Sequence, residues 1–369
     1  MCEPHEIEIG VLVLQNSIAE RPLTVDNQLL SNQVLPEQVL SEQVLSALDI
    51  VVAGETEQVT PARRHEPHDV EDSASELAPL HVRIVTFAAV ALPPFALVGV
   101  MLLAWGGWFH WIDLALLGGM YVLTGLGVTI GYHRLYTHKS FATRGPIAAF
   151  FGICGSMAVQ GPLIWWCATH RKHHQHSDDI LDPHSPHAGR APGMVGFAKG
   201  FLHSHVGWLF ADITPDMKRY VPDLLGDKTT LRISNAFPLL VLAGFAIPAL
   251  IGGLVTMTWM GALLGFLWGG VVRMLLLHHV TWSVNSVCHI WGAKEYNSGD
   301  ESRNNPVMGI LAFGEGWHNN HHAFPASARH GLRWWQFDMS WVVIRSLERF
   351  GLAKKVRLPG AERLATKKV

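Results

Sequence analysis

The stretch from Ile112 to His138, IDLALLGGMYVLTGLGVTIGYHRLYTH, joins a run of apolar residues to two histidines five positions apart. Its apolar part, Ile112–Ile130, is long enough to cross a bilayer as a helix. In an ideal α-helix, five residues place His133 and His138 roughly 140° apart around the axis. If the two side chains are to converge, the helix must therefore end or distort between them.

Two further histidine clusters share the pattern His-x-x-His-His, which places three imidazoles on one face of a helix. Their members are His170, His173, His174, His318, His321 and His322. Asn285 and His289 lie one helical turn apart and add another candidate pair. The three clusters contain eight imidazoles and no cysteine. That is too many ligands for one metal ion, but it suits two ions of iron, copper or zinc.

Four stretches are apolar and long enough to span a membrane, in a chain whose 369 residues are 49% hydrophobic and only 16% charged. They are Ile84–Trp105, Ile112–Ile130, Phe237–Val255 and Trp259–Leu277. A fifth apolar stretch, Ile147–Cys167, contains Gln160 and Pro162 and separates the first two histidine clusters. If it crossed, those clusters would face opposite sides, so we predict a non-crossing helix that lies at or in the membrane interface.

These segments predict an all-α integral membrane protein, with four transmembrane helices in two hairpins and a helical cap that carries the histidines. Residues 1–80 contain 15 acidic and three basic side chains, and we interpret them as a disordered acidic tail with a short helix near Glu42–Val52. Residues 81–350 form the membrane domain, and residues 351–369 form a basic C-terminal tail. The positive-inside rule then places the cap and both termini in the cytoplasm, at a bacterial inner membrane or the endoplasmic reticulum.

Four carboxylates lie close to the clusters in sequence: Asp178, Asp179, Asp182 and Glu315. A carboxylate that accepts a hydrogen bond from a metal-binding imidazole orients the ring and balances the charge of the ion. Each of these residues would serve equally well as a helix cap or as a solvated surface charge. The sequence leaves both roles open.

The surroundings of the clusters resemble the membrane fatty acyl desaturases of the stearoyl-CoA (Δ9) type, over about residues 84–335 and in the expected order. The motifs that carry the resemblance are Trp166, Asp182-Pro-His184, Ser204-His-Val-Gly-Trp208, Asn285-Ser-Val-Cys-His289 and Gly316-Trp-His-Asn-Asn-His-His-Ala-Phe-Pro325. The resemblance implies an enzyme that uses two iron ions and O2 to introduce a cis double bond, at Δ9, into a saturated acyl chain carried by CoA or a lipid.

The resemblance also implies a set of metal ligands and no catalytic residue beyond them. The implied iron ligands are His133, His138, His170, His173, His174, His289, His318, His321 and His322, with Asn285 acting through a water molecule.

The acyl chain is expected to lie along the second span. Tyr121, Gly125 and Thr129 precede His133 at intervals of four, so they form one helical stripe that ends at the metal site. Tyr121 lies roughly 18 Å from His133 along the axis, which is of the order needed for the tail beyond a mid-chain double bond. Alternatively, Gly125 allows a neighbouring span to approach closely. We also expect Gln160, Trp166 and Trp208 to contact the substrate, and the last two lie in the motifs that carry the resemblance.

Two sites depart from the animal members of this family that use acyl-CoA. Those members carry Arg-Asp before the second histidine cluster and Arg-Lys after the His-Val-Gly-Trp motif, where this chain has Ala168-Thr169 and Asp212-Ile213. Cationic contacts to the CoA phosphates are missing at these positions. The family favours acyl-CoA, and a phospholipid or an acyl carrier protein remains open as the carrier.

The expected partners follow from the same resemblance. Because no haem domain of the cytochrome b5 kind follows the desaturase-like region, electrons are expected from a separate ferredoxin or cytochrome b5-like donor with its reductase. Membrane lipids are the other expected partner, and no nucleic acid is expected.

Two other functions fit parts of the pattern. A related di-iron membrane hydroxylase, of the alkane or carotenoid type, shares the histidine clusters but inserts oxygen, and the neighbouring motifs favour the desaturase. A metal transporter or sensor would place polar ligands inside the spans to form a pathway. Here the histidines follow the spans, which argues against that class.

The four-span arrangement makes a prediction about sidedness. A reporter fused after Val369 is expected to read cytoplasmic, and one inserted at Gly107 is expected to read external, because two hairpins return the chain to its starting side. Paired fluorescent-protein and phosphatase fusions measure this directly. A cytoplasmic reading at both positions would overturn the four-span arrangement.

Overall fold

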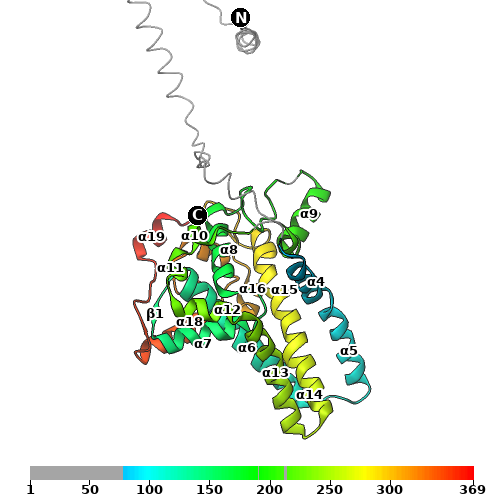
Figure 1. Cartoon of the computed structure of the whole chain (residues 1–369). Coiled ribbons are helices and arrows are strands. Elements are labelled where there is room, and N and C mark those ends of the chain that lie inside the picture. The colour runs from blue at the N-terminus through cyan, green and yellow to red at the C-terminus, as the bar shows by residue number, and fades with distance from the viewer. Residues whose placement is uncertain (1–77, 190, 212–213) are drawn as a thin grey trace, which may run out of the picture. The chain divides into compact units, whose positions relative to one another are not determined.

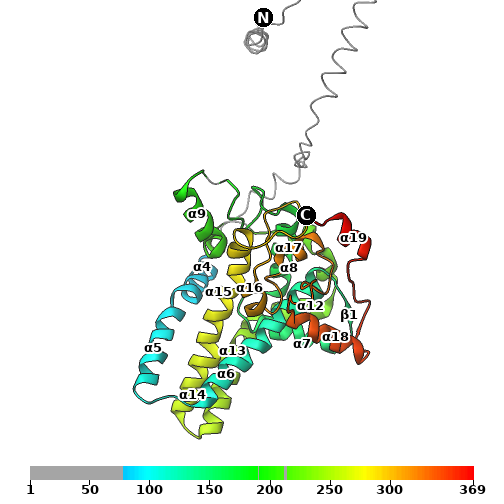
Figure 2. The same cartoon turned by 180° about the vertical axis from the view of Figure 1, so that it is seen from behind.

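The computed structural model describes residues 78–369 except 190, 212 and 213. The expectations for the acidic tail, including a helix near Glu42–Val52, fall on residues 1–77 and lie outside this described part, as does the pair Asp212-Ile213. Within it, nearly every element is a helix (Figures 1 and 2), as predicted for an all-α protein.

Four helical runs are apolar and long enough to cross a membrane, in agreement with the four predicted spans. In chain order, the runs are Leu80–Trp105, Trp111–Thr137, Phe237–Thr256 and Trp259–His289. Their elements are α4 (Leu80–Ala91), α5 (Pro93–Trp105), α6 (Trp111–Leu126), η1 (Gly127–Thr137), α13 (Phe237–Thr256), α14 (Trp259–Gly265), η3 (Phe266–Val272), α15 (Arg273–Ser286) and η4 (Val287–His289). The prolines Pro93 and Pro94 separate α4 from α5, since proline cannot continue a preceding helix without a break.

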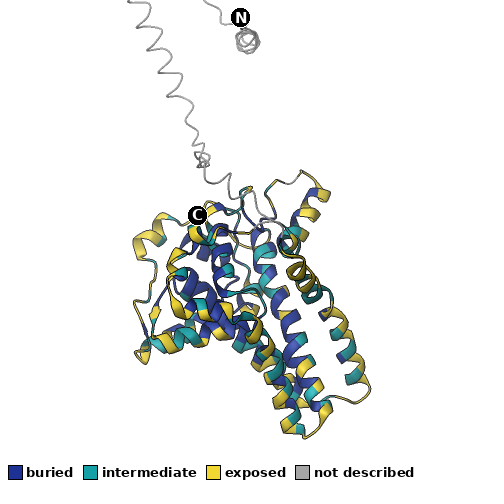
Figure 3. Ribbon diagram, in the orientation of Figure 1, coloured by how far each residue is buried: buried dark blue, intermediate teal, exposed yellow. Residues whose placement is uncertain are grey.

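The fourth run lies at the centre of the spans. α13 packs along α14 and η3, and both α5 and α6 pack against η3. Small residues permit the close contact of α13 with α14, because a Cβ at Gly252 would lie 2.3 Å from the carbonyl oxygen of Gly261. α5 packs mainly against η3 rather than against α6. Apolar side chains such as Phe95 on α5 and Leu250 on α13 are exposed, and Figure 3 shows exposed positions along both helices. Such surfaces are compatible with contact with lipid.

Two of the runs extend beyond the apolar stretches from which they were predicted. η1 continues to Thr137 and η4 to His289, whereas the apolar pattern ends at Ile130 and Leu277. The additional turns are polar and largely buried by the cap. The same helices that form the spans therefore carry histidines into the cap.

The fifth apolar stretch, Ile147–Cys167, is two helices and not the single one predicted. α7 (Gly145–Ser156) ends before a turn, and α8 (Leu163–His176) begins after Pro162. In the turn, Val159 and Gly161 have φ of 64° and 103°, a region that ends a helix. With 12 residues, α7 is about 18 Å long, too short for a hydrocarbon core of about 30 Å.

The cap consists of short helices and one small sheet beside the ends of the spans. Its further helices are α9 (Met194–His205), η2 (Gly207–Phe210), α10 (Met217–Tyr220), α11 (Pro222–Leu225), α12 (Lys228–Asn235), α16 (Pro306–Leu311), α17 (His318–Ala323), α18 (Met339–Arg349) and α19 (Ala361–Thr366). Strand β1 (Ala142–Thr143) pairs antiparallel with β2 (Ala353–Lys354). Through β2 and a hydrogen bond from Lys367 Nζ to the carbonyl oxygen of Ala323 (2.9 Å), residues 351–369 lie against the cap.

Arg273, at the start of α15, joins three elements in the interior. Its guanidinium is fully buried and donates to the carbonyl oxygens of Met157 at 2.9 Å and Gly244 at 3.3 Å, as well as to Gly269 in the preceding turn. One turn later, Nε2 of His278 lies 3.1 Å from the carbonyl oxygen of Ala158. These contacts fix the turn between α7 and α8, and hence the direction in which α8 leaves it.

Arg273→Met is expected to lower the free energy of unfolding by about 3 kcal/mol, because it leaves buried carbonyl oxygens without a charged donor. Unfolding in mixed micelles measures the change. Arg345→Met, which removes an exposed guanidinium paired with Glu348, is the matched control and should change stability by less than about 1 kcal/mol. Equal stability of the two variants would contradict the role of Arg273.

Candidate metal centre

The second span brings its two histidines together by a change of helical winding. η1 is a π-helix, and the backbone N–H of His138 donates to the carbonyl oxygen of His133 at 3.1 Å. A π turn closes over five residues instead of four, and the two imidazole rings lie 4.8 Å apart between centroids. The sequence predicted that the helix would either end or distort between the two histidines. The structure shows a distortion, because the helix continues to Thr137 with π winding.

α8 and α17 carry the other two clusters, and each helix contributes to two groups of ligands. On α8, His170 and His174 approach each other at 3.1 Å between Nε2 atoms, whereas His173 turns towards His322, at 3.3 Å. On α17, His321 lies with the first pair. The three imidazoles of each helix, which share one face, are thus divided between two groups of ligands.

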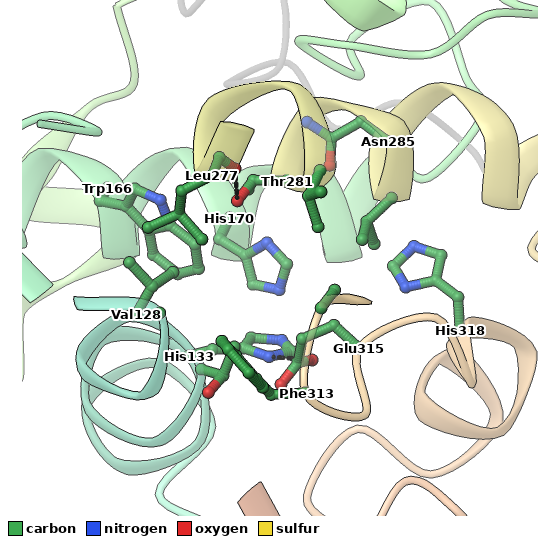
Figure 4. A pocket seen from close by; sticks show the side chains of 15 residues that line it. Val128, His133, Trp166, His170, Leu277, Thr281, Asn285, Phe313, Glu315 and His318 are labelled. Carbon is green, nitrogen blue, oxygen red and sulfur yellow. Dashed lines mark hydrogen bonds and ion pairs between the residues drawn. The ribbon is translucent and has the colours of Figure 1, made fainter. Parts of the chain in front are cut away.

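The histidines converge in two groups, within each of which the ligand nitrogens lie within 4.8 Å of one another. The five-histidine cluster consists of His133, His138, His170, His174 and His321. The four-histidine cluster consists of His173, His289, His318 and His322. These are the nine histidines that the sequence singled out, and Figure 4 shows three of them, His133, His170 and His318, around one pocket.

Both clusters have the spacing of ligands around a metal ion. Nε2 of His321 lies 3.0 Å from Nε2 of His133 and 2.8 Å from that of His174, and the Nε2 atoms of His289 and His318 are 3.1 Å apart. Nitrogens that each lie about 2.1 Å from one ion are separated by about 3 Å when they meet at right angles. An all-imidazole donor set suits iron, copper or zinc better than magnesium or calcium.

An unpartnered nitrogen supports the same reading. Nε2 of His138 is buried and has no hydrogen-bond partner among the described residues. A buried polar atom without a partner is costly, and a metal ion at the centre of the five-histidine cluster would relieve that cost. The residues therefore fit a metal ion at each cluster.

Carboxylates hold the opposite ring nitrogen of four of these imidazoles. The contacts from Nδ1 are His133 to Glu315 at 2.7 Å, His173 to Asp182 at 3.0 Å, His289 to Asp178 at 3.0 Å and His322 to Asp300 at 2.6 Å. Such a contact places the proton on Nδ1 and leaves the lone pair of Nε2 for an ion. Of the four predicted carboxylates, Asp178, Asp182 and Glu315 take this position, whereas Asp179 accepts a hydrogen bond from the backbone N–H of Ile180.

Burial sets the protonation states that metal binding needs. It lowers the pKa well below the ordinary value for His138, His170, His174, His318 and His321. These imidazoles are therefore neutral near pH 7 and have a lone pair to donate. Burial alone would raise the pKa of Asp178, but the neighbouring His289 outweighs it, and the pKa falls to about 2. The balance is the same for Asp182 beside His173 and Asp300 beside His322, whose pKa values are also lowered.

Glu315 belongs to a buried network centred on Arg134. The guanidinium of Arg134 is fully buried and lies 3.1 Å from Glu315 and 3.0 Å from Asp338. Asp338 also accepts the backbone N–H of His330 at 2.7 Å and that of Trp341, at the start of α18. Through Glu315, Arg134 therefore links His133 to Asp338, the N-terminal capping residue of α18.

Arg134, Asp300 and His330 were not predicted as parts of the site. Nδ1 of His330 lies 3.1 Å from Glu315, and its ring is 4.4 Å from that of His321. Arg134 lies inside the first histidine cluster. A charged side chain directly after an apolar span is a signal of a functional role, and this signal could have identified it. Asp300 lies in a polar loop, where nothing in the sequence distinguishes it from a surface carboxylate.

One pocket adjoins both clusters. It is lined by His133 and His170 of one cluster, His318 of the other, and residues of η1, α8, α15 and the loop after α16 (Figure 4). The predicted substrate residues in its lining are Gly125, Thr129 and Trp166, and Asn285 lies there too.

The other three predicted substrate residues are not among those that line this pocket. Gln160 donates to the hydroxyl of Thr281, which does line it, at 2.8 Å. Trp208 stacks on Trp165, with 6.2 Å between the ring centroids. Tyr121 packs behind the ring of Phe313.

The fold and the two clusters define a helical protein with four candidate membrane spans and two adjoining histidine clusters that could each hold a metal ion. Residues 107–353 match the fatty acid desaturase family, and the chain therefore belongs to that family. It is an oxidoreductase of the desaturase class.

Characterised relatives differ in the reaction that their names state. A hex-5-enoyl-[acyl-carrier protein] acetylenase of Moorena producens is 38% identical over 279 residues, 75% of this chain and 87% of the relative. A chloroplastic palmitoyl-monogalactosyldiacylglycerol delta-7 desaturase of Arabidopsis thaliana is 41% identical, over 68% of this chain and 64% of the relative. An sn-1 stearoyl-lipid 9-desaturase of Synechocystis is 37% identical, over 80% of this chain and 86% of the relative. Family membership thus assigns desaturation without assigning the Δ9 position.

Proposed function

We propose that each histidine cluster holds one iron ion, and that the protein uses O2 to place a cis double bond at Δ9 of a saturated acyl chain in a membrane lipid. The observation that carries the proposal is the pocket that adjoins both clusters, because it brings histidines of both together with apolar side chains. When bound, iron and O2 supply the oxidising power to remove hydrogen from an unactivated C–H bond, which no side-chain acid or base achieves.

The pocket lining would bind and place the acyl chain. Val128, Leu277, Val284 and Phe313 present apolar surface, which favours a hydrocarbon chain and excludes water. A chain held there passes His133 and His318, so one pair of adjacent carbons is presented to both clusters. Holding the reacting bond in place is the main contribution that the protein makes to such a reaction.

Asn285 would complete the four-histidine side of the centre. It lies on α15 one turn before His289, and its side chain lines the pocket (Figure 4). An amide can accept a hydrogen bond from a water molecule and donate one, so Asn285 is suited to hold an iron ion through water. This is the role that the family resemblance implies.

Phe313 and Gly125 contact each other in the lining of the pocket, and we infer that this contact closes the end of the acyl pocket away from the histidines. A Cβ at Gly125 would lie 2.3 Å from Cε2 of Phe313, so the helix and the ring are in direct contact. Tyr121 supports the ring from behind, with 5.5 Å between centroids, and its hydroxyl donates to the carbonyl oxygen of Leu311 at 2.8 Å. The chain length beyond the double bond is thus limited by Phe313, with Tyr121 behind it.

Phe313→Ala is expected to shift the products to acyl chains that are longer beyond the double bond, because the end of the pocket opens. Gly125→Leu is expected to shift them to shorter chains. Gas chromatography of products from lipids of defined chain length measures both. Tyr121→Phe keeps the ring and loses only the hydroxyl, so it is the matched control.

Iron content should remain that of the native protein in all three variants. An unchanged chain-length profile in both Phe313→Ala and Gly125→Leu would assign Gly125 to helix packing alone.

The residues of α8 at the positions where the animal acyl-CoA enzymes carry Arg-Asp support a lipid as the acyl carrier. Ala168 is fully buried, and the hydroxyl of Thr169 donates to the carbonyl oxygen of Trp165 at 2.9 Å. Neither position offers a charge to the phosphates of CoA, in contrast to the animal acyl-CoA enzymes. The name of the Synechocystis relative states a lipid-linked substrate, which supports the same carrier here.

The cap and both termini would lie in the cytoplasm, with the two pairs of spans as hairpins. Electrons would come from a separate ferredoxin or cytochrome b5-like protein. Lys354, in β2, and Lys355, directly after it, are exposed, and their charge suits an acidic donor whose binding weakens with salt.

Alanine at any of the nine clustered histidines is expected to remove iron and to lower desaturation by roughly 100-fold or more, since each loss opens a coordination position. Iron stoichiometry of the purified protein is the primary measurement. His279→Ala is the control, because His279 pairs with His205 at 3.0 Å and belongs to neither cluster. Full iron content in His138→Ala would remove that residue from the ligand set.

The proposed function is tested by expressing the chain in a host that lacks unsaturated fatty acids. The expected result is growth without a supplement and lipid-linked chains with a Δ9 cis double bond, neither of which appears with His138→Ala. Analysis of intact lipids and of the acyl-CoA pool during a short pulse identifies the carrier. Hydroxylated chains in place of alkenes would contradict the proposal.

A further inference from the structure

The carboxylates around the two clusters are unequally distributed. In the four-histidine cluster, three of the four imidazoles contact a carboxylate through Nδ1. In the five-histidine cluster, the contact of His133 with Glu315 is the one such pair within the described residues. The two candidate metal sites therefore differ in their electrostatic surroundings, although both are made of imidazoles.

The three carboxylates of the four-histidine cluster are held in place by further hydrogen bonds. Asp178 accepts the backbone N–H of Glu301 at 2.8 Å, and Asp182 accepts that of Asp178 at 2.9 Å. Asp300 accepts the backbone N–H of Ser302 at 3.0 Å and the hydroxyl of Ser298 at 2.7 Å. These donors stabilise the ionised carboxylates, so three negative charges stand directly behind this cluster.

The one carboxylate of the five-histidine cluster is compensated. Arg134 lies 3.1 Å from Glu315 and contacts Asp338 as well. One guanidinium and two carboxylates give this group a net charge of −1, against −3 for Asp178, Asp182 and Asp300. A carboxylate on Nδ1 makes the imidazole a stronger ligand, and negative charge nearby favours a cation.

We infer that the four-histidine cluster is the tighter of the two metal sites, that it fills first, and that Asp178, Asp182 and Asp300 give it this affinity. The inference rests on the proposed function, in which each cluster holds an iron ion. The three aspartates act through the histidines, so they are positioning residues. The weaker, five-histidine site is then the one whose occupancy limits the active enzyme when iron is scarce.

The test is an anaerobic titration of the metal-free, full-length protein in detergent with Fe(II), in which a competing chromophoric chelator reports the free metal. The native protein is expected to bind two ions in steps separated by at least tenfold. His138→Ala removes a ligand of the five-histidine cluster and should abolish the weaker step. His318→Ala should abolish the tighter one.

Asp300→Asn and Asp178→Asn replace a carboxylate by an amide of the same shape, and each is expected to weaken the tighter step by roughly 10- to 100-fold and leave the weaker step unchanged. Glu301→Gln is the matched control, because Glu301 lies next to Asp300 but its side chain pairs with Lys294 and Arg303. Ser302→Ala removes the hydrogen bonds of the hydroxyl to Asp300 and to Ser298 but keeps the carboxylate. It should weaken the same step to a smaller extent, which keeps the test usable if Asp300→Asn does not fold.

Two equal binding steps in the native protein, or loss of the weaker step in Asp300→Asn, would overturn the inference and leave the proposed function intact. Failure of the native protein to bind iron at either cluster would overturn the proposed function itself. The two failures are therefore distinguishable in one experiment.

Discussion

Nine imidazoles can pack into two adjoining clusters only if the tautomer and the direction of the rings are set. The contacts from Nδ1 to Glu315, Asp182, Asp178 and Asp300 settle this for four of the rings and turn their Nε2 atoms inward. Burial keeps other members of the clusters neutral, as the lowered pKa of His138 shows. Nε2 separations near 3 Å would otherwise set lone pair against lone pair. A shared cation at each cluster is the arrangement that relieves this repulsion.

The helices that form the candidate spans also position the ligands. The second run changes to π winding where it leaves its apolar part, and this change places His133 and His138 side by side. The fourth run continues through α15 to His289 and, through Arg273 and His278, holds the turn that aims α8. The same helices therefore form the candidate spans and hold the two histidine clusters. Because η1 and α15 continue the apolar runs, the pocket between them is lined by apolar side chains as well as by histidines of both clusters.

The sequence predicted the local part of this account well. Apolar length identified the four candidate spans. The spacing of the histidines identified eight of the nine residues that the structure gathers in two groups. The ninth, His289, came from its pairing with Asn285 and from the family resemblance. Apolar length and histidine spacing are each read within a single helix, so they do not depend on contacts between distant parts of the chain. The distribution of His170, His173 and His174 between two groups was not predictable, because it depends on which helices face α8.

Long-range contacts account for what the sequence missed. Asp300 contacts His322 from a loop, and Arg134 contacts Asp338, which lies 204 residues later in the sequence. Phe313, which has φ of 54° in the turn before Glu315, lines the pocket and contacts Gly125 of α6, far away in the sequence. Gln160-Gly161-Pro162 is a signal for the break of Ile147–Cys167 into α7 and α8. Because the residues on both sides of it are apolar, the stretch was interpreted as one helix.

The central claim is that two ions lie at the two clusters, and the most direct measurement is anomalous X-ray diffraction at the iron absorption edge from crystals of the iron-loaded protein. The account predicts two anomalous peaks, one at about 2.1 Å from the nitrogens of the five-histidine cluster and one at a similar distance from those of the four-histidine cluster. A single peak shared by both clusters, or peaks away from the nine imidazoles, would contradict it.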